Sequence, residues 1–119
     1  MLQPSAARPR IVMTVGIARL TLFLPDVHSL KEKRMVLRRV KDRAQQKFNV
    51  AIAEVGENDL WQRALLGMAV VGNGRRFVES ALDEVVRFVR AEAEVTNVER
   101  EIQTFGDALA ENDLGFTTR

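Results

Sequence analysis

The chain of 119 residues contains no cysteine and only one histidine. Without cysteine it has no disulfide framework, no thiolate metal site and no cysteine nucleophile. One histidine is too few for a multi-histidine zinc or iron centre. No apolar stretch is long enough to span a bilayer, and Arg19 interrupts the run that follows Arg8 and Arg10, which argues against a signal peptide. These absences favour a cytoplasmic protein with no metal, no cofactor and no membrane partner.

The formal net charge is only +2, but the charges are unevenly distributed. Residues 28–47 carry eight Lys or Arg and two acidic residues, whereas residues 48–119 carry seven Arg and thirteen acidic residues. A short segment of concentrated positive charge on an acidic body can steer a polyanion towards one face. The simpler interpretation is a well-solvated helix that keeps the protein in solution.

The hydrophobic content of 46% is ordinary for a globular protein, and the length suits one domain. Apolar periodicity predicts strands at 13–24, 50–55, 64–71 and 95–105 and helices at 29–48 and 75–91. Strands and helices in the order β-α-β-β-α-β predict an α+β fold of the ferredoxin-like type. Its four-stranded antiparallel sheet carries two helices on one face. We expect a domain at 13–105, with flexible tails at 1–12 and 106–119.

The first predicted helix contains the positive charge. Ser29 and Glu32 have the spacing of a capping box. Cations spaced by three or four residues project together and can follow a phosphate backbone. The candidate nucleic-acid-binding residues on this helix are Lys31, Lys33, Arg34, Arg38 and Lys41.

Alternation in the first strand predicts two apolar faces. One face, with Leu20 and Leu22, would pack against the helices, and the other, with Val15, Ile17 and Phe23, would stay uncovered. An uncovered apolar face usually marks a partner surface. We therefore expect a homodimer formed through the open face of the sheet.

Two further places supply candidate contact residues. For Trp61 we favour packing over the end of the sheet, with Arg63 paired to Asp59 or Glu54, and the alternative is contact with a base or a partner protein. Arg75 and Arg76 follow Gly72-Asn73-Gly74, where a helix start can hold a phosphate, although a simple turn and helix cap is favoured. The candidate contact residues are Trp61, Arg63, Arg75 and Arg76.

The segment 22–37, LFLPDVHSLKEKRMVL, resembles the YlxP-like family of small bacterial proteins, a domain of unknown function. The pattern L-P-x-x-x-S-L-K-E-K-R corresponds to residues 24–34, and further blocks match at 48–55 and 59–71. The resemblance implies a ferredoxin-like fold. Genes of this family often lie among those for transcription elongation, translation initiation and ribosome maturation, which suggests an RNA- or ribosome-related role by association only.

The sequence lacks the signatures of related folds with known chemistry. The third strand has no aromatic residue for base stacking of the RNA-recognition-motif type. The loop 25–28 has neither the Gly nor the Arg of an acylphosphatase cradle, and Asp26, His28 and Ser29 are too close in sequence to form a triad readily. We therefore predict no catalytic residues and a non-enzymatic protein that binds RNA or a ribosomal particle. The alternatives are a regulatory module that binds an acidic protein, and an enzyme with a small substrate on the sheet.

Overall fold

The computed structural model describes residues 12–106, which form four strands and two helices. The elements are β1 (Met13–Phe23), α2 (Leu30–Lys47), β2 (Ala51–Gly56), β3 (Arg63–Gly72), α3 (Arg75–Glu92) and β4 (Glu94–Phe105). Each predicted element is present, with bounds within one residue of those expected. The tails predicted at 1–12 and 106–119 lie, apart from residues 12 and 106, outside the described part of the chain.

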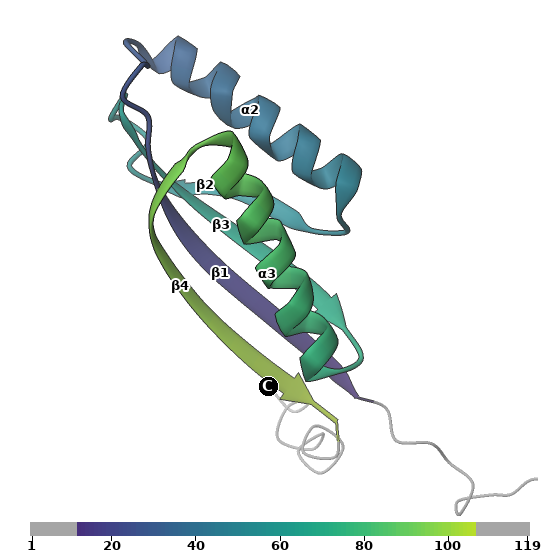
Figure 1. The fold of residues 1–119 in the computed structure, drawn as a ribbon. Helices are drawn as coiled ribbons and strands as arrows, with labels where there is room; N and C mark the ends of the chain where they lie inside the picture. Colours follow the sequence, from purple (N-terminus) through teal and green to yellow (C-terminus); the bar gives the residue numbers. More distant parts are fainter. Residues whose placement is uncertain (1–11, 107–119) are drawn as a thin grey trace, which may run out of the picture.

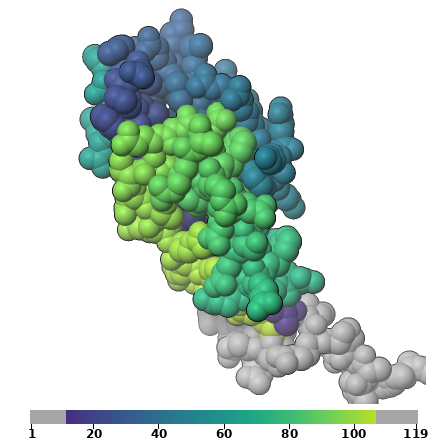
Figure 2. Space-filling view, viewed as in Figure 1, coloured from purple at the N-terminus to yellow at the C-terminus, as the bar shows by residue number. Residues whose placement is uncertain are grey.

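The strands form one antiparallel sheet in the order β2-β3-β1-β4. The crossover from β1 through α2 to β2 leaves a gap that β3 fills, and α3 then returns the chain to β4 at the other edge. Figure 1 shows both helices on the same side of the sheet, and Figure 2 shows them covering that side. This arrangement confirms the ferredoxin-like α+β fold.

The core lies between the helices and one face of the sheet. The side chains of Leu20 and Leu22 in β1 are fully buried, as the alternation in the sequence predicts. Val40 of α2 and Leu82 of α3 meet this face and are also fully buried. Each such side chain contributes roughly 2 kcal/mol relative to full exposure, so the apolar stripes of the two helices fix them on this face.

Gly16 allows α3 to approach β1 closely. A Cβ atom at this position would lie 2.4 Å from Cγ1 of Val78 and 2.8 Å from Cδ1 of Leu82. Real carbon atoms do not approach this closely, so a larger residue would push α3 away from the sheet. The glycine is therefore a packing requirement of the helix–sheet interface.

The start of α2 is held by the predicted cap. The hydroxyl of Ser29 accepts the backbone N–H of Glu32 at 3.1 Å, and the Glu32 carboxylate accepts the backbone N–H of His28 at 2.8 Å. In the standard capping box this carboxylate accepts the backbone N–H of the N-cap residue, whereas here it accepts that of the preceding residue, His28. It nevertheless anchors the loop from β1 to the first turn of α2.

Candidate functional site

The cations of α2 are divided between two flanks of the helix. Arg43 on one flank lies 2.9 Å from Glu92 of α3, so this flank faces the second helix. Helical spacing puts Lys31, Arg34, Arg38 and Lys41 on the opposite flank, above the outer edge of β2. We call these four residues the basic stripe. Three of them are exposed and Lys41 is half-buried.

No carboxylate among residues 12–106 lies within 4.0 Å of any cation of the basic stripe. Most of the other arginines in residues 12–106, by contrast, form an ion pair with a carboxylate. The arginines that do have acidic partners are Arg19, Arg43, Arg63, Arg75 and Arg100. The stripe therefore presents its charge to solvent instead of neutralising it within the fold.

Lys33 does not belong to this surface, which corrects its assignment as a nucleic-acid-binding residue. Its side chain is only 1% exposed and points into the protein. Its ammonium donates to the backbone oxygens of Glu57 at 2.6 Å and Leu60 at 2.7 Å, and lies 2.9 Å from the Glu54 carboxylate. A buried ammonium needs such partners because removing it from water is costly. Lys33 therefore acts on the fold and not on a ligand.

The sequence did hold a signal for this burial. Lys33 lies three residues after Leu30 and four before Leu37, which places it within the apolar stripe of α2. Its charge suggested a solvated position, but its helical phase is that of the core. The partner carboxylate on β2 became apparent only once the strand was placed beneath the helix.

The loop between β2 and β3 is tied to its surroundings at several points. Besides the two bonds from Lys33, the Gln62 amide donates to the backbone oxygens of Pro25 at 3.1 Å and Val27 at 3.2 Å. The backbone carbonyl of Gln62 accepts the backbone N–H of Leu24 at 2.8 Å. These bonds hold the loop against both the β1–α2 connection and the first turns of α2.

Arg63 also differs from expectation at this loop. Its guanidinium lies 2.9 Å from the carboxylate of Glu57, and not beside Asp59 or Glu54. Glu57 follows the irregular end of β2 and has a φ of 58°, in the left-handed region that few residues other than glycine adopt. This turn of the backbone brings the Glu57 carbonyl to Lys33 and its carboxylate to Arg63.

Trp61 is not a buried cap, so the packing interpretation of this residue is wrong. Its side chain is 51% exposed, and the neighbouring Leu60 is 48% exposed. With Phe23, which is 38% exposed, they border a hollow of about 450 Å³. Its other lining residues are Asp59, Gln62 and Arg63. An aromatic side chain thus stands in solvent on a loop that the rest of the fold holds in place.

The structure does not bring Arg75 and Arg76 to the same place as Trp61. These residues open α3, whereas the end of α2 meets the later turns of α3, where Phe48 packs against Phe88. A hollow lined by Lys47 and Phe77 lies between the two helices. Arg75 pairs with Glu79 at 3.1 Å, and Arg76 is exposed. The start of α3 has the form of a turn and a cap, with Gly74 as N-cap.

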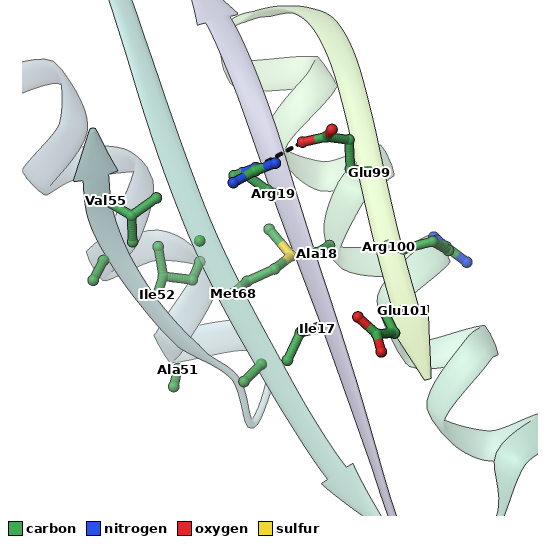
Figure 3. Close-up of a pocket in the computed structure, with 13 residues that line it drawn as sticks. Ile17, Ala18, Arg19, Ala51, Ile52, Val55, Met68, Glu99, Arg100 and Glu101 are labelled. Carbon is green, nitrogen blue, oxygen red and sulfur yellow. Dashed lines mark hydrogen bonds and ion pairs between the residues drawn. The ribbon is translucent and has the colours of Figure 1, made fainter. Parts of the chain in front are cut away.

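The open face of the sheet carries a shallow trough of about 590 Å³ between β2 and β4 (Figure 3). Small or apolar residues form its floor, including Ile17, Ala53 and Ala69. Arg19 and Glu99 form an ion pair of 2.6 Å across one side, and the guanidinium lowers the pKa of the Glu99 carboxyl. This face corresponds to the uncovered face that the strand alternation predicted.

Neither α2 nor α3 has the length and hydropathy of a helix that spans a membrane. Within residues 12–106, no three His, Cys, Asp or Glu side chains lie close enough together to hold a metal ion.

Solved structures that resemble this one include two proteins of low sequence identity. The de novo designed protein Foldit4 matches with a TM-score of 0.45 and 13% identity, over 78% of this chain and 96% of that one. The apo form of LarC2, the C-terminal domain of a cyclometallase involved in the synthesis of the NPN cofactor of lactate racemase, matches with a TM-score of 0.47 and 14% identity. That match covers 79% of this chain and 57% of the LarC2 chain.

Comparison with known sequences gives a closer match. Over 81 residues the chain is 42% identical to the uncharacterized protein YlxP of Bacillus subtilis (strain 168). The aligned region covers 68% of this chain and 88% of that protein. Residues 15–102 match the family model described as protein of unknown function (DUF503). The matched region runs from β1 into β4 and includes both helices, the buried Lys33 and the Trp61 loop. The chain therefore belongs to the DUF503 family, as its resemblance to YlxP-like proteins predicted.

Proposed function

We propose that this protein is a cytoplasmic, non-enzymatic binding protein that contacts RNA or a ribosomal particle through the basic stripe of α2. One observation carries the proposal: four cations share a flank of the helix, and no carboxylate of the described residues neutralises them. Charges that only keep a protein in solution need not lie together on one flank of a helix.

The stripe has the dimensions of a phosphate-binding surface. Ten residues of helix separate Lys31 from Lys41, which corresponds to about 15 Å along the axis. A rigid row of this length can meet several phosphates of one strand. Each contact releases condensed counterions, so the affinity should fall steeply with salt. The basic stripe consists of Lys and Arg alone, with no Asn, Gln or aromatic side chain among them, and we expect these cations to act mainly on the phosphate backbone.

Two triple variants with the same change of net charge test this proposal. The first, Lys31→Glu/Arg34→Glu/Arg38→Glu, reverses the stripe. The second, Arg39→Glu/Arg76→Glu/Arg87→Glu, reverses three exposed arginines elsewhere that also lack an acidic partner among the described residues. Any difference between the two variants therefore reports position and not total charge.

Binding of a structured RNA hairpin is measured by filter binding between about 50 and 200 mM salt. We expect the stripe variant to lose at least about tenfold in affinity and about one unit of log–log salt slope per reversed cation. The control variant should lose much less. Wild-type binding that does not respond to salt, or equal losses in both variants, would overturn the proposal.

The open face supports the non-enzymatic part of the proposal. Its trough is lined mainly by small and apolar residues, and Glu99 is engaged by Arg19 at 2.6 Å. General acid–base chemistry needs a carboxyl group that is free to exchange a proton with a substrate. The second carboxylate of the trough, Glu101, accepts a hydrogen bond of 3.1 Å from the Gln103 amide, so both carboxylates that line it have a partner.

The alternative partner is an acidic protein, and the position of the stripe favours it to a lesser degree. The stripe overhangs β2, whose outer edge pairs with no other strand within residues 12–106. An extended acidic segment could add to this edge and place carboxylates near the cations. Association with a partner that survives ribonuclease treatment, yet is lost in the stripe variant, would favour this function over RNA binding.

We also propose that the protein forms a homodimer through the open face. Ile17 and Val55 of this face are about half exposed, and the trough between them is apolar. Burying such a surface against a second copy removes it from water. In sedimentation equilibrium, Ile17→Lys should weaken the dimer, whereas Met35→Lys on the exposed side of α2 should not. A wild-type protein that stays monomeric at high concentration would contradict this proposal.

A further inference from the structure

We infer that the hollow at Trp61 binds an unpaired nucleobase of the RNA whose phosphates lie on the basic stripe. This inference rests on the proposed function and names the form of RNA that it requires. It follows from three observations: the lining of the hollow, the way its loop is held, and the position of that loop at the end of the molecule where α2 begins.

The hollow has the chemistry of a stacking site. Trp61, Leu60 and Phe23 border it from the loop and from the last residue of β1, and each is more than a third exposed. Its volume of about 450 Å³ leaves room for a flat ring against the indole. Aromatic side chains stack on any base, because every base has a π face.

The loop is arranged before any ligand arrives. Lys33 binds the carbonyls of Glu57 and Leu60, and Gln62 binds those of Pro25 and Val27. Trp61 therefore stands between two residues that are each fixed to other elements. A rigid aromatic loses little conformational freedom on binding, which favours its use as a contact residue.

The same bonds hold the backbone of the Trp61 loop beside the first turns of α2, which carry Lys31 and Arg34 of the basic stripe. Leu60, which precedes Trp61, accepts a hydrogen bond of 2.7 Å from Lys33, and Lys33 precedes Arg34 of the stripe. Figure 1 shows the β2–β3 loop beside the start of α2, at one end of the molecule. Proteins that bind single strands combine such an aromatic platform with cations that follow the backbone. The hollow itself is lined by Phe23 and Arg63, which lie opposite each other on the open face of the sheet, so an RNA strand with a base on Trp61 reaches α2 by passing around this end of the molecule.

The experiment uses Trp61 itself as the reporter, because the chain contains one tryptophan and no tyrosine. The full chain is titrated with a 12-nucleotide single-stranded oligouridylate and, in parallel, with a blunt RNA duplex of equal length. We expect saturable quenching of the tryptophan fluorescence by the single strand and little by the duplex. Equal quenching by both would overturn the inference, because a paired base is not available for stacking.

Variants then separate stacking from charge. Trp61→Ala should weaken binding of the oligouridylate by about 5- to 150-fold, the range for loss of one stacked base. It should leave the salt slope unchanged, and Trp61→Phe should retain most of the affinity. Phe77→Ala removes another exposed aromatic, on α3, and serves as the control. Circular dichroism establishes that each variant is folded.

The outcomes distinguish this inference from the proposed function. If salt-dependent RNA binding persists while Trp61→Ala binds as tightly as the wild type, the inference fails and the proposed function stands. If the wild type binds neither RNA, both fail. If Trp61→Ala and Phe77→Ala lose the same affinity, stacking at this hollow is again refuted.

Discussion

The ammonium of Lys33 lies 2.9 Å from the carboxylate of Glu54, and this pair joins α2 to the edge strand β2 beneath the loop that carries Trp61. The lysine is buried, whereas the glutamate retains 20% of its side-chain exposure. The two loop carbonyls that Lys33 also binds make the pair part of a small polar network inside an otherwise apolar interface. Such a network stabilises only while all its members are present.

The first prediction concerns this network. Lys33→Met should lower the free energy of unfolding by about 3 kcal/mol, because it leaves the partly buried Glu54 carboxylate without its ion-pair partner and two backbone carbonyls without their donor. Urea denaturation measures the change, and Lys31→Met, on the exposed side of the same helix, is the control. The double variant Lys33→Met/Glu54→Leu should regain part of the loss. If Lys33→Met is as stable as Lys31→Met, the network does not contribute to stability.

The second prediction concerns Gly16. Gly16→Ala should lower the free energy of unfolding by about 2 kcal/mol, because its methyl group would overlap Val78 and Leu82 of α3. Gly74→Ser is the control, since no atom lies within 4 Å of a Cβ there and the backbone is extended. The control should be neutral or slightly stabilising, because serine is favoured as an N-cap. Thermal unfolding of both variants measures the difference, and similar melting temperatures would contradict the close packing of α3.

The third prediction concerns the start of α2. Ser29→Ala should lower the free energy of unfolding by about 1 kcal/mol through loss of the bond to the Glu32 N–H. Ser80→Ala, at an exposed position within α3, should have little effect or stabilise slightly, because alanine has the higher helix propensity. Chemical denaturation of the two variants tests the cap, and equal stabilities would show that it is dispensable.

The fourth prediction concerns the ion pair on the open face. Arg19 lowers the pKa of Glu99, so Arg19→Gln should raise that pKa towards its ordinary value. A carboxyl group whose pKa is lower in the folded than in the unfolded protein stabilises the fold at pH values above its unfolded-state pKa. This contribution is lost as the pH falls through the lower, folded-state pKa. Carboxyl carbon NMR measures the titration of Glu99. Arg100→Gln, whose guanidinium pairs with Asp83 instead, should leave it unchanged. A Glu99 titration that is the same with and without Arg19 would refute the coupling.

The fold could be predicted from the sequence because its signals are local. The alternation around Leu20 and Leu22 and the apolar stripe through Leu37 and Val40 place one side of each element in the core. The cap at Ser29 marks where the helix begins. Such patterns repeat within a few residues, so no knowledge of distant contacts is needed to interpret them.

The site was predictable only in part. Helical spacing alone groups Lys31, Arg34, Arg38 and Lys41, and the structure does place them on one flank. The charge of Lys33 predicts the same surface, whereas its helical phase, between Leu30 and Leu37, is that of the core. Its burial depends on Glu54, which lies twenty-one residues further along the chain. It also depends on two backbone carbonyls of the loop, and no residue type in the sequence indicates where these will lie. The exposure of Trp61 likewise depends on how that loop is held.

By itself, the sequence determined the order of the elements, which side of each faces the core and where positive charge gathers on the first helix. These properties follow from side-chain type and spacing, which the chain carries wherever it folds. Only the tertiary structure decided which cation is buried, which acid Arg63 meets and whether Trp61 stands in solvent. These outcomes depend on groups from separate elements, because the burial of a charge is stable only where the fold supplies its partners.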